Sequence, residues 1–332
     1  MKTSVVLAEI SRGSFSESAH LGHAVVCDDT GNIIKSWGNP DEIILPRSSC
    51  KMIQALPLIT SGASEAFSLN TRHLALACAS HQGADIHTDL VVNWLKHLGL
   101  EDADFRCGAQ MPDDIVSREA LIKSKQQPCQ FHNNCSGKHS GFLTLSKHLK
   151  AGPEYIEANH PVQRACLEAF ETVTDAKSPG FAIDGCSAPN YAASLSNVAG
   201  AMAWFASASY RSDRASKAAS TLVDAMRFYP ELVAGEGQAC TELMRAMDRK
   251  VAIKTGAEGV FVAIVPEKKI GIAVKVTDGA RRGSECAIAA LLVAIGVLNP
   301  DHPATKKRMN APITNWRGIE TGFIRPAANL IL

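Results

Sequence analysis

The chain has 332 residues, of which 46% are hydrophobic and 20% charged, a composition typical of a globular protein with a large core. Its net charge of +1 gives no electrostatic basis for binding nucleic acid or an anionic membrane. Residues 1–9 lack the apolar stretch of a signal peptide, and the apolar run at 287–298 is too short to span a bilayer. We therefore expect a cytoplasmic protein whose 10 cysteines are mostly reduced.

The first forty residues predict strands, including a hairpin over 24–37 with a turn at 28–32. Pro46 then starts a helix that Pro57 should kink or end, with Ser61 and Gly62 as a stop signal. Ser48 and Lys51 lie three residues apart near its first turn, so the amine can lie beside the hydroxyl. A lysine whose pKa is lowered by burial or by another cation can activate a serine. A helix start with a solvated lysine explains the same pattern.

An apolar run over 74–78 opens into a small-residue turn at 79–83, and helices are predicted at about 84–98 and 114–123. In that turn, Ser80 is either a displayed site group or the cap of the next helix. Residues 132–142 are dense in Asn, Cys, Lys and His and show no apolar periodicity. They form either a solvated loop or a site loop whose polar groups have partners.

The middle of the chain predicts helices at about 161–172, 191–209, 211–226 and 230–247. Between the first two, residues 181–190 end an apolar run with Asp184 and Cys186, which suits a turn or a site loop. The last third predicts a hairpin over 260–276, a helix over 282–298 and an irregular tail from residue 301.

Strands at both ends with helices between them predict an α+β fold, with an antiparallel sheet from the terminal segments and a helical insertion. We expect one unit over 1–332, with a sheet subdomain at about 1–45 and 250–332 and a helical, site-loop subdomain at about 46–249. This arrangement would bring the turn at 254–256 close to the Ser48 helix. S-x-x-K followed by Lys-Thr-Gly occurs in serine β-lactamases and penicillin-binding proteins, where lysines tune proton transfer to a serine.

Five segments, taken in order, resemble the rhizobial-type (class 3) L-asparaginases: residues 46–55, 79–83, 133–141, 184–189 and 254–259. The resemblance runs over nearly the whole chain. It implies hydrolysis of L-asparagine to L-aspartate and ammonia, a fold related to glutaminases and serine β-lactamases, and a homodimer.

The resemblance also implies two catalytic Ser–Lys pairs, Ser48 with Lys51 and Ser80 with Lys254. It implies a zinc site formed by Cys135, Lys138, Cys186 and a water, with Asp184 beside it as a substrate-binding candidate. Taken alone, Cys-x-x-Lys is an unusual zinc spacing, because a lysine must lose its proton to bind the metal; a buried thiol and a solvated lysine explain it equally. Arg47 and His139 flank these motifs and are candidate partners for the substrate carboxylate, although ordinary surface or supporting roles suit them as well.

The hypothesis from the sequence is a double displacement. Ser48, deprotonated by Lys51, attacks the side-chain amide carbon, and water then hydrolyses the acyl-enzyme. Two alternatives stay open: a serine acyl hydrolase like the β-lactamases and penicillin-binding proteins, and a non-catalytic protein that binds asparagine or zinc on the same scaffold.

Overall fold

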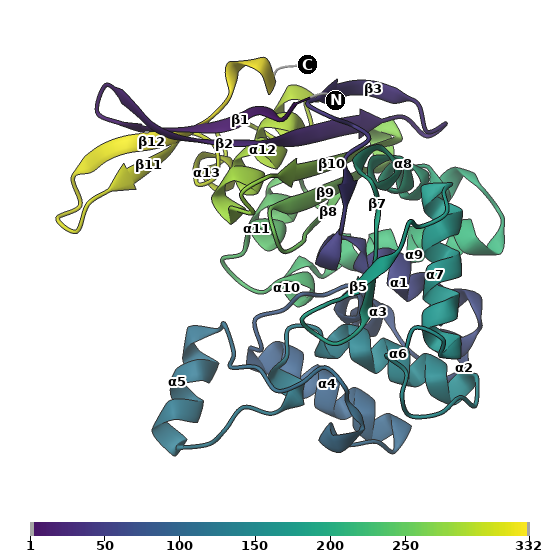
Figure 1. Cartoon of the computed structure of the whole chain (residues 1–332). Helices are drawn as coiled ribbons and strands as arrows, with labels where there is room; N and C mark the ends of the chain where they lie inside the picture. Colours follow the sequence, from purple (N-terminus) through teal and green to yellow (C-terminus); the bar gives the residue numbers. More distant parts are fainter. Residues whose placement is uncertain (1–2, 331–332) are drawn as a thin grey trace. The chain divides into compact units, whose positions relative to one another are not determined.

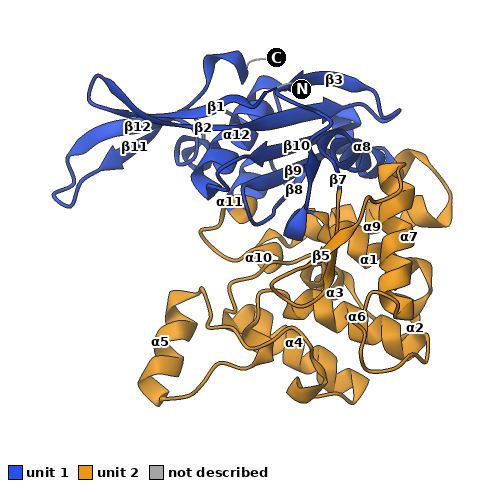
Figure 2. Cartoon of the chain, in the orientation of Figure 1, with its two compact units in different colours: residues 1–49, 193–207, 242–332 blue, residues 50–192, 208–241 orange. Residues whose placement is uncertain are grey.

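The computed structural model describes residues 3–330 and divides the chain into two compact units (Figures 1 and 2). Unit 1 comprises residues 1–49, 193–207 and 242–332, and unit 2 comprises residues 50–192 and 208–241. Residues 46–49, 193–207 and 242–249, which we placed in the helical subdomain, therefore cluster with the sheet. No helix within residues 3–330 has the length and hydropathy that crossing a bilayer requires.

Unit 1 is built on an antiparallel sheet whose strands come from both ends of the chain. Its order is β11-β12-β1-β2-β10-β9-β8, with β3 also paired to β2. The bounds are β1 Val5–Arg12, β2 Phe15–Cys27, β3 Ile33–Trp37, β8 Ala252–Thr255, β9 Val260–Val265, β10 Ile270–Val276, β11 Ala311–Thr314 and β12 Glu320–Pro326. The short strands β4 (Ile43–Ile44) and β7 (Ala193–Ser194) pair separately.

Helices α8 (Leu195–Ala206) and α12 (Arg281–Ala294) cover opposite faces of this sheet. The thiol of Cys27 in β2 donates a hydrogen bond to a backbone carbonyl of α8. Gly271 of β10 also lies against α8, because a Cβ at this position would be 2.2 Å from backbone atoms of that helix. His20, seven positions before Cys27 on β2, instead contacts Gly283 of α12. Because side chains alternate along a strand, an odd separation places the two helices on different faces.

The remaining elements of unit 1 are short. They are η5 (Pro266–Lys268), α13 (Pro303–Lys306) and η6 (Ala328–Leu330). Two elements cross the division between the units: η1 (Arg47–Cys50), which leads directly into α1, and α11 (Ala239–Ala246).

Unit 2 is mainly helical and is organised around α1 (Lys51–Thr60). Eight consecutive residues of α1, Lys51 to Leu58, are buried, because α3, α6, α7 and α9 pack around it. The helix runs past Pro57 and ends at Ser61 and Gly62. The other elements are α2 Ala63–Ala66, α3 Thr71–Ala77, α4 Asp85–Leu98, η2 Asp102–Asp104, α5 Ile115–Ser124, η3 Gln130–His132, α6 Ser136–His148, α7 Pro161–Thr174, β5 Phe181–Ile183, β6 Pro189–Tyr191, η4 Ala208–Tyr210, α9 Arg214–Phe228 and α10 Pro230–Val233.

The α+β class, with an antiparallel sheet from the terminal segments, is confirmed. Three local predictions are wrong. The helix predicted over 191–209 begins only at Leu195, and the one over 230–247 is two helices separated by Gly235 and Gly237, both at positive φ. The tail after residue 301 is not irregular, because β11 and β12 form a hairpin that pairs with β1.

Candidate active site

The amine of Lys51 lies inside unit 2, where the first turn of the buried helix α1 places it. The residue is 1% exposed, and Nζ donates to the carbonyl of Ala79, to Ser80 Oγ at 3.0 Å and to Cys135 Sγ at 3.1 Å. Lys51, which we paired with Ser48 from the sequence, therefore contacts Ser80. An amine and a hydroxyl at this distance can exchange a proton once the amine is neutral.

The Ser80 turn is held by backbone hydrogen bonds on both sides. Ser80 N donates to the Val233 carbonyl at 2.9 Å, and His81 N donates to the Asn134 carbonyl at 3.1 Å. Helices α3 and α6 approach closely here, since a Cβ on Gly137 would lie 2.3 Å from a carbonyl of α3. This approach brings the start of α6, with Cys135 as its N-cap, beside Ser80.

A second polar cluster of unit 2 joins the start of α6 to the β5–β6 turn. Lys138 Nζ lies 3.0 Å from Cys186 Sγ, and the thiols of Cys135 and Cys186 share a hydrogen bond. All three side chains are buried. Cys186 is positioned by a tight turn in which Ser187 adopts a left-handed conformation with φ of 69°.

The protonation states of Cys135, Lys138 and Cys186 depend on one another. The hydrogen bond from Cys135, together with the nearby Lys138, lowers the pKa of Cys186 well below that of an ordinary thiol and outweighs its burial. The same hydrogen bond and burial raise the pKa of Cys135. Burial disfavours the charge on Lys138, but Cys186 and Cys135 outweigh it and raise the pKa of the amine. The first proton lost from the two thiols therefore comes from Cys186.

The donor set Cys135, Lys138 and Cys186 suits a thiophilic divalent cation such as zinc. Two thiols and an amine converge in a buried place, and sulfur and nitrogen are the donors that zinc prefers. Among residues 3–330 no group of three His, Cys, Asp or Glu side chains could hold a metal, so the site depends on Lys138 as its third donor. A cation bound there would have to replace the proton that Cys186 stabilises on Lys138.

His139 is fully buried between Tyr155 and Cys186. Its Nδ1 lies 2.9 Å from the Tyr155 hydroxyl, which accepts a hydrogen bond from the backbone N–H of Arg106 at 2.8 Å. The Tyr155 proton thus points to Nδ1, since otherwise a buried hydroxyl proton would lack an acceptor at a cost of about 1–3 kcal/mol. The ring proton then sits on Nε2. Burial lowers the pKa of His139 despite the opposing effect of Cys186.

Asp184 lies in the β5–β6 turn, where its N–H donates to the carbonyl of Ala188 at 2.9 Å. Its own Oδ1 accepts the N–H of Gly185 at 2.7 Å. The carboxylate acts on Lys138 and helps to raise the pKa of that amine. Asp184 therefore acts electrostatically on one of the proposed metal ligands, and its role toward the substrate stays a prediction.

In unit 1, the Lys-Thr-Gly segment packs against the segment that carries Ser48. A Cβ on Gly256 would lie 2.6 Å from the Pro46 carbonyl and 3.2 Å from the Ser49 N–H nitrogen, so only glycine fits without a shift. Ser49 Oγ donates to the Pro46 carbonyl at 2.7 Å. Arg47 has a φ of 53°, a strained value for a residue with a side chain. The predicted proximity of the turn at 254–256 to the Ser48 segment is confirmed.

The structure thus divides the predicted site residues between the two units. Unit 2 brings together Lys51, Ser80, Cys135, Lys138, His139, Asp184 and Cys186, and unit 1 holds Arg47, Ser48 and Lys254. Lys254 is fully buried, and its Nζ donates to the carbonyl of Thr255 at 2.8 Å. Tyr155, the partner of His139, could not be identified from the sequence, because it lies in a segment without motif or periodicity.

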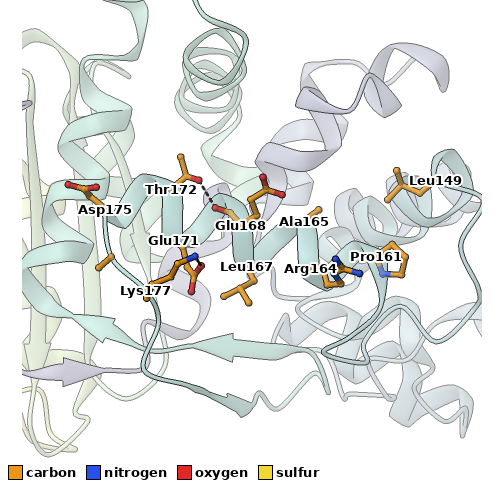
Figure 3. Close-up of a pocket in the computed structure, with 11 residues that line it drawn as sticks. Leu149, Pro161, Arg164, Ala165, Leu167, Glu168, Glu171, Thr172, Asp175 and Lys177 are labelled. Carbon is orange, nitrogen blue, oxygen red and sulfur yellow. Dashed lines mark hydrogen bonds and ion pairs between the residues drawn. The ribbon is translucent and has the colours of Figure 1, made fainter.

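One hollow of unit 2 is separate from these residues. It has a volume of about 1000 Å³ and runs along the outer side of α7 (Figure 3). Its lining includes the ion pair between Lys177 and Glu171 at 2.6 Å and contains none of the predicted site residues. We therefore do not assign the chemistry to this groove.

A sequence model of the family described as L-asparaginase II matches residues 8–326. The chain belongs to the L-asparaginase II family. No curated protein sequence matches the chain.

Among solved structures, the chain is similar to a β-lactamase from Mycobacterium bovis, with 12% identity, a TM-score of 0.48, and 83% of this chain and 95% of that chain covered. It is also similar to Mglu in its glutamate form, with 13% identity, a TM-score of 0.49, and 85% and 62% covered. A third is the octameric penicillin-binding protein homologue from Pyrococcus abyssi, with 14% identity, a TM-score of 0.36, and 90% and 80% covered.

Proposed function

We propose that this protein is an L-asparaginase that hydrolyses L-asparagine to L-aspartate and ammonia through a serine acyl-enzyme. Membership of the L-asparaginase II family over residues 8–326 supports the activity. The observation that carries the mechanism is the contact of 3.0 Å between the buried amine of Lys51 and the hydroxyl of Ser80. Such a pair supplies a base whose amine is buried and a hydroxyl that is partly accessible.

In the proposed first step, Ser48 Oγ bonds to the side-chain amide carbon of the substrate and transfers its proton to neutral Lys51. The C–N bond then breaks, and ammonia leaves after receiving a proton through Ser80 and Lys254. A water molecule hydrolyses the resulting ester, releases aspartate and restores the serine hydroxyl. We favour Ser48 as the nucleophile because it lies at the start of a helix, where N–H groups stabilise developing negative charge.

We propose that zinc binds to Cys135, Lys138, Cys186 and a water. When bound, the cation supplies positive charge that orients polar groups of the substrate. Arg47 and Asp184 are the proposed contacts to the charged ends of the amino acid. A different role for His139, based on its hydrogen-bond partners, is argued below.

The test is ammonia release from L-asparagine and L-glutamine by the wild type and by Ser48→Ala and Ser80→Ala. Both variants should lose several orders of magnitude in kcat while keeping the folded far-UV spectrum. Ser146→Ala is the control, because it removes a buried hydroxyl that donates to the Gly152 carbonyl and has no contact with Lys51. Near-normal turnover by Ser48→Ala would overturn its assignment as nucleophile, and nitrocefin turnover without ammonia release would favour a β-lactamase-like hydrolase.

We further propose a homodimer in the cytoplasm, as the family resemblance and the composition suggest. The expected mass in light scattering is twice the 35.4 kDa of the chain. Cell fractionation tests the location.

A further inference from the structure

Nε2 of His139 is a buried polar atom without a hydrogen-bond partner in the described part of the chain. The ring is fixed on its other side by Tyr155 and is flanked at its edge by Phe142, with ring centroids 5.5 Å apart. Cys186, whose sulfur accepts a hydrogen bond from Lys138, also acts on the His139 ring. Since Tyr155 occupies Nδ1, Nε2 is the ring nitrogen left to interact with this sulfur. His139 therefore borders the proposed metal site without facing solvent.

The hydrogen-bond partners of Tyr155 determine which ring nitrogen of His139 carries the proton. Its hydroxyl accepts from the Arg106 backbone, so it donates to Nδ1 and leaves Nε2 as the protonated nitrogen. A doubly protonated ring would carry a proton on Nε2 as well. The conclusion therefore does not depend on whether the ring is charged.

We propose that His139 is a positioning residue that donates Nε2–H to the sulfur of Cys186 and so holds this thiolate in place to bind the metal. The proposal rests on the metal site of the proposed function. Hydrogen bonds to a ligating atom fix its orientation and commonly change metal affinity by about 10- to 100-fold. Metal binding by Nε2 itself would require this nitrogen to lose its proton and the hydrogen bond between Tyr155 and Nδ1 to rearrange, so the donor role is the one that keeps the observed contacts.

Two amide variants separate this role from a purely structural one. Gln places its amide N–H near the position of Nε2, so His139→Gln keeps a donor for Cys186 but loses the contact to Tyr155. Asn places its amide near Nδ1, so His139→Asn keeps the contact to Tyr155 but does not reach Cys186. His139→Phe keeps an aromatic ring without a donor.

The measurement is the zinc Kd of each purified full-length variant, obtained by competition with a chromophoric chelator at one pH, with the melting temperature of the metal-free protein alongside. We expect His139→Gln to bind zinc within about threefold of the wild type, and His139→Asn and His139→Phe to bind about 10- to 100-fold more weakly. Should one of the latter two fail to fold, the other still provides the comparison.

Equal zinc affinity in all variants would overturn the proposal, as would stronger binding by His139→Asn than by His139→Gln. A wild type that binds no zinc would overturn both this proposal and the proposed metal site. Ammonia release by that same protein would show that the asparaginase proposal stands, because the two measurements are independent.

Discussion

Replacing Lys51 by methionine removes the amine on which the proposed mechanism depends and keeps the length of the apolar stem. Three partners would lose their donor: the Ala79 carbonyl, Ser80 Oγ and Cys135 Sγ. A positioned general base contributes about 10²–10⁴ to a rate, so we expect kcat for ammonia release to fall about 10³-fold. At about 1.4 kcal/mol for each tenfold change, this corresponds to roughly 4 kcal/mol of lost transition-state stabilisation.

Stability should respond differently from activity. Each buried acceptor left without a donor costs about 1–3 kcal/mol, but the variant no longer buries a polar amine, so the two effects oppose each other. We expect a folded variant with a modest change in melting temperature. Coupled-enzyme detection of ammonia gives kcat, and thermal unfolding gives the stability.

Two companion variants sharpen this experiment. Lys51→Arg keeps a positive charge that cannot be removed near neutral pH, so it should be as inactive as Lys51→Met if the amine acts as a base. Lys147→Met changes an exposed lysine of α6 and should leave kcat unchanged. Activity of Lys51→Met within tenfold of the wild type, or substantial activity of Lys51→Arg, would refute the role of base.

Three other perturbations test separate parts of the structure. Gly256→Ala places a Cβ 2.6 Å from the Pro46 carbonyl, so it should destabilise the protein by about 1–3 kcal/mol and lower kcat about 10²-fold by displacing the Ser48 segment. Acidification should destabilise the protein below pH 6.5, because burial lowers the pKa of His81 and of His87 in the folded state while both take up protons near 6.5 when unfolded. With both rings neutral in the folded state throughout, two such groups reduce the free energy of unfolding in urea by up to about 2 kcal/mol between pH 6.5 and 5.5. Removal of zinc with a chelator should lower the melting temperature by several degrees, and added zinc should restore it, since a ligand of the native state stabilises that state.

Each of these has a control. Gly200→Ala in α8 meets nothing within 4 Å and should hold or raise stability by up to about 1 kcal/mol, so an equal loss in both glycine variants would contradict the steric argument. His81→Gln should reduce the pH slope of the unfolding free energy by about one proton, and an unchanged slope would exclude His81 as a contributor. A melting temperature unaffected by the chelator would count against a tightly bound metal.

The elements that the sequence predicts correctly are those set by local chemistry. The hairpin of β2 and β3 follows from its turn residues, α4 ends at Gly99 in the left-handed conformation, and α5 is capped by the side chain of Asp114. The hairpin of β11 and β12 was missed because its strand character depends on pairing with β1, more than 300 residues away in the chain. Local propensity does not report such a pairing.

The same distinction holds for the site. The motif spacing identified Lys51, and the family resemblance identified Ser80 and paired it with Lys254; in the folded chain Ser80 contacts Lys51. The proton on Nε2 of His139 depends on Tyr155 and on the backbone of Arg106, which meet only in the folded chain. The pairing of Ser48 with Lys51, the zinc ligands, the location and the oligomeric state stay predictions.

The amine of Lys51 contacts both a hydroxyl and a thiol, the first assigned to the proposed acyl transfer and the second to the proposed metal site. Whatever draws Cys135 Sγ away frees one of the N–H groups that the amine now directs to its three partners, and so changes how the amine can reorient toward Ser80 Oγ. A change at the proposed metal ligand Cys135 would therefore alter the hydrogen bonding of Ser80 through Lys51 Nζ alone, without any movement of the backbone. Losses caused by changes at Cys135 and at Ser80 should consequently overlap rather than add, as expected of neighbours that share one partner.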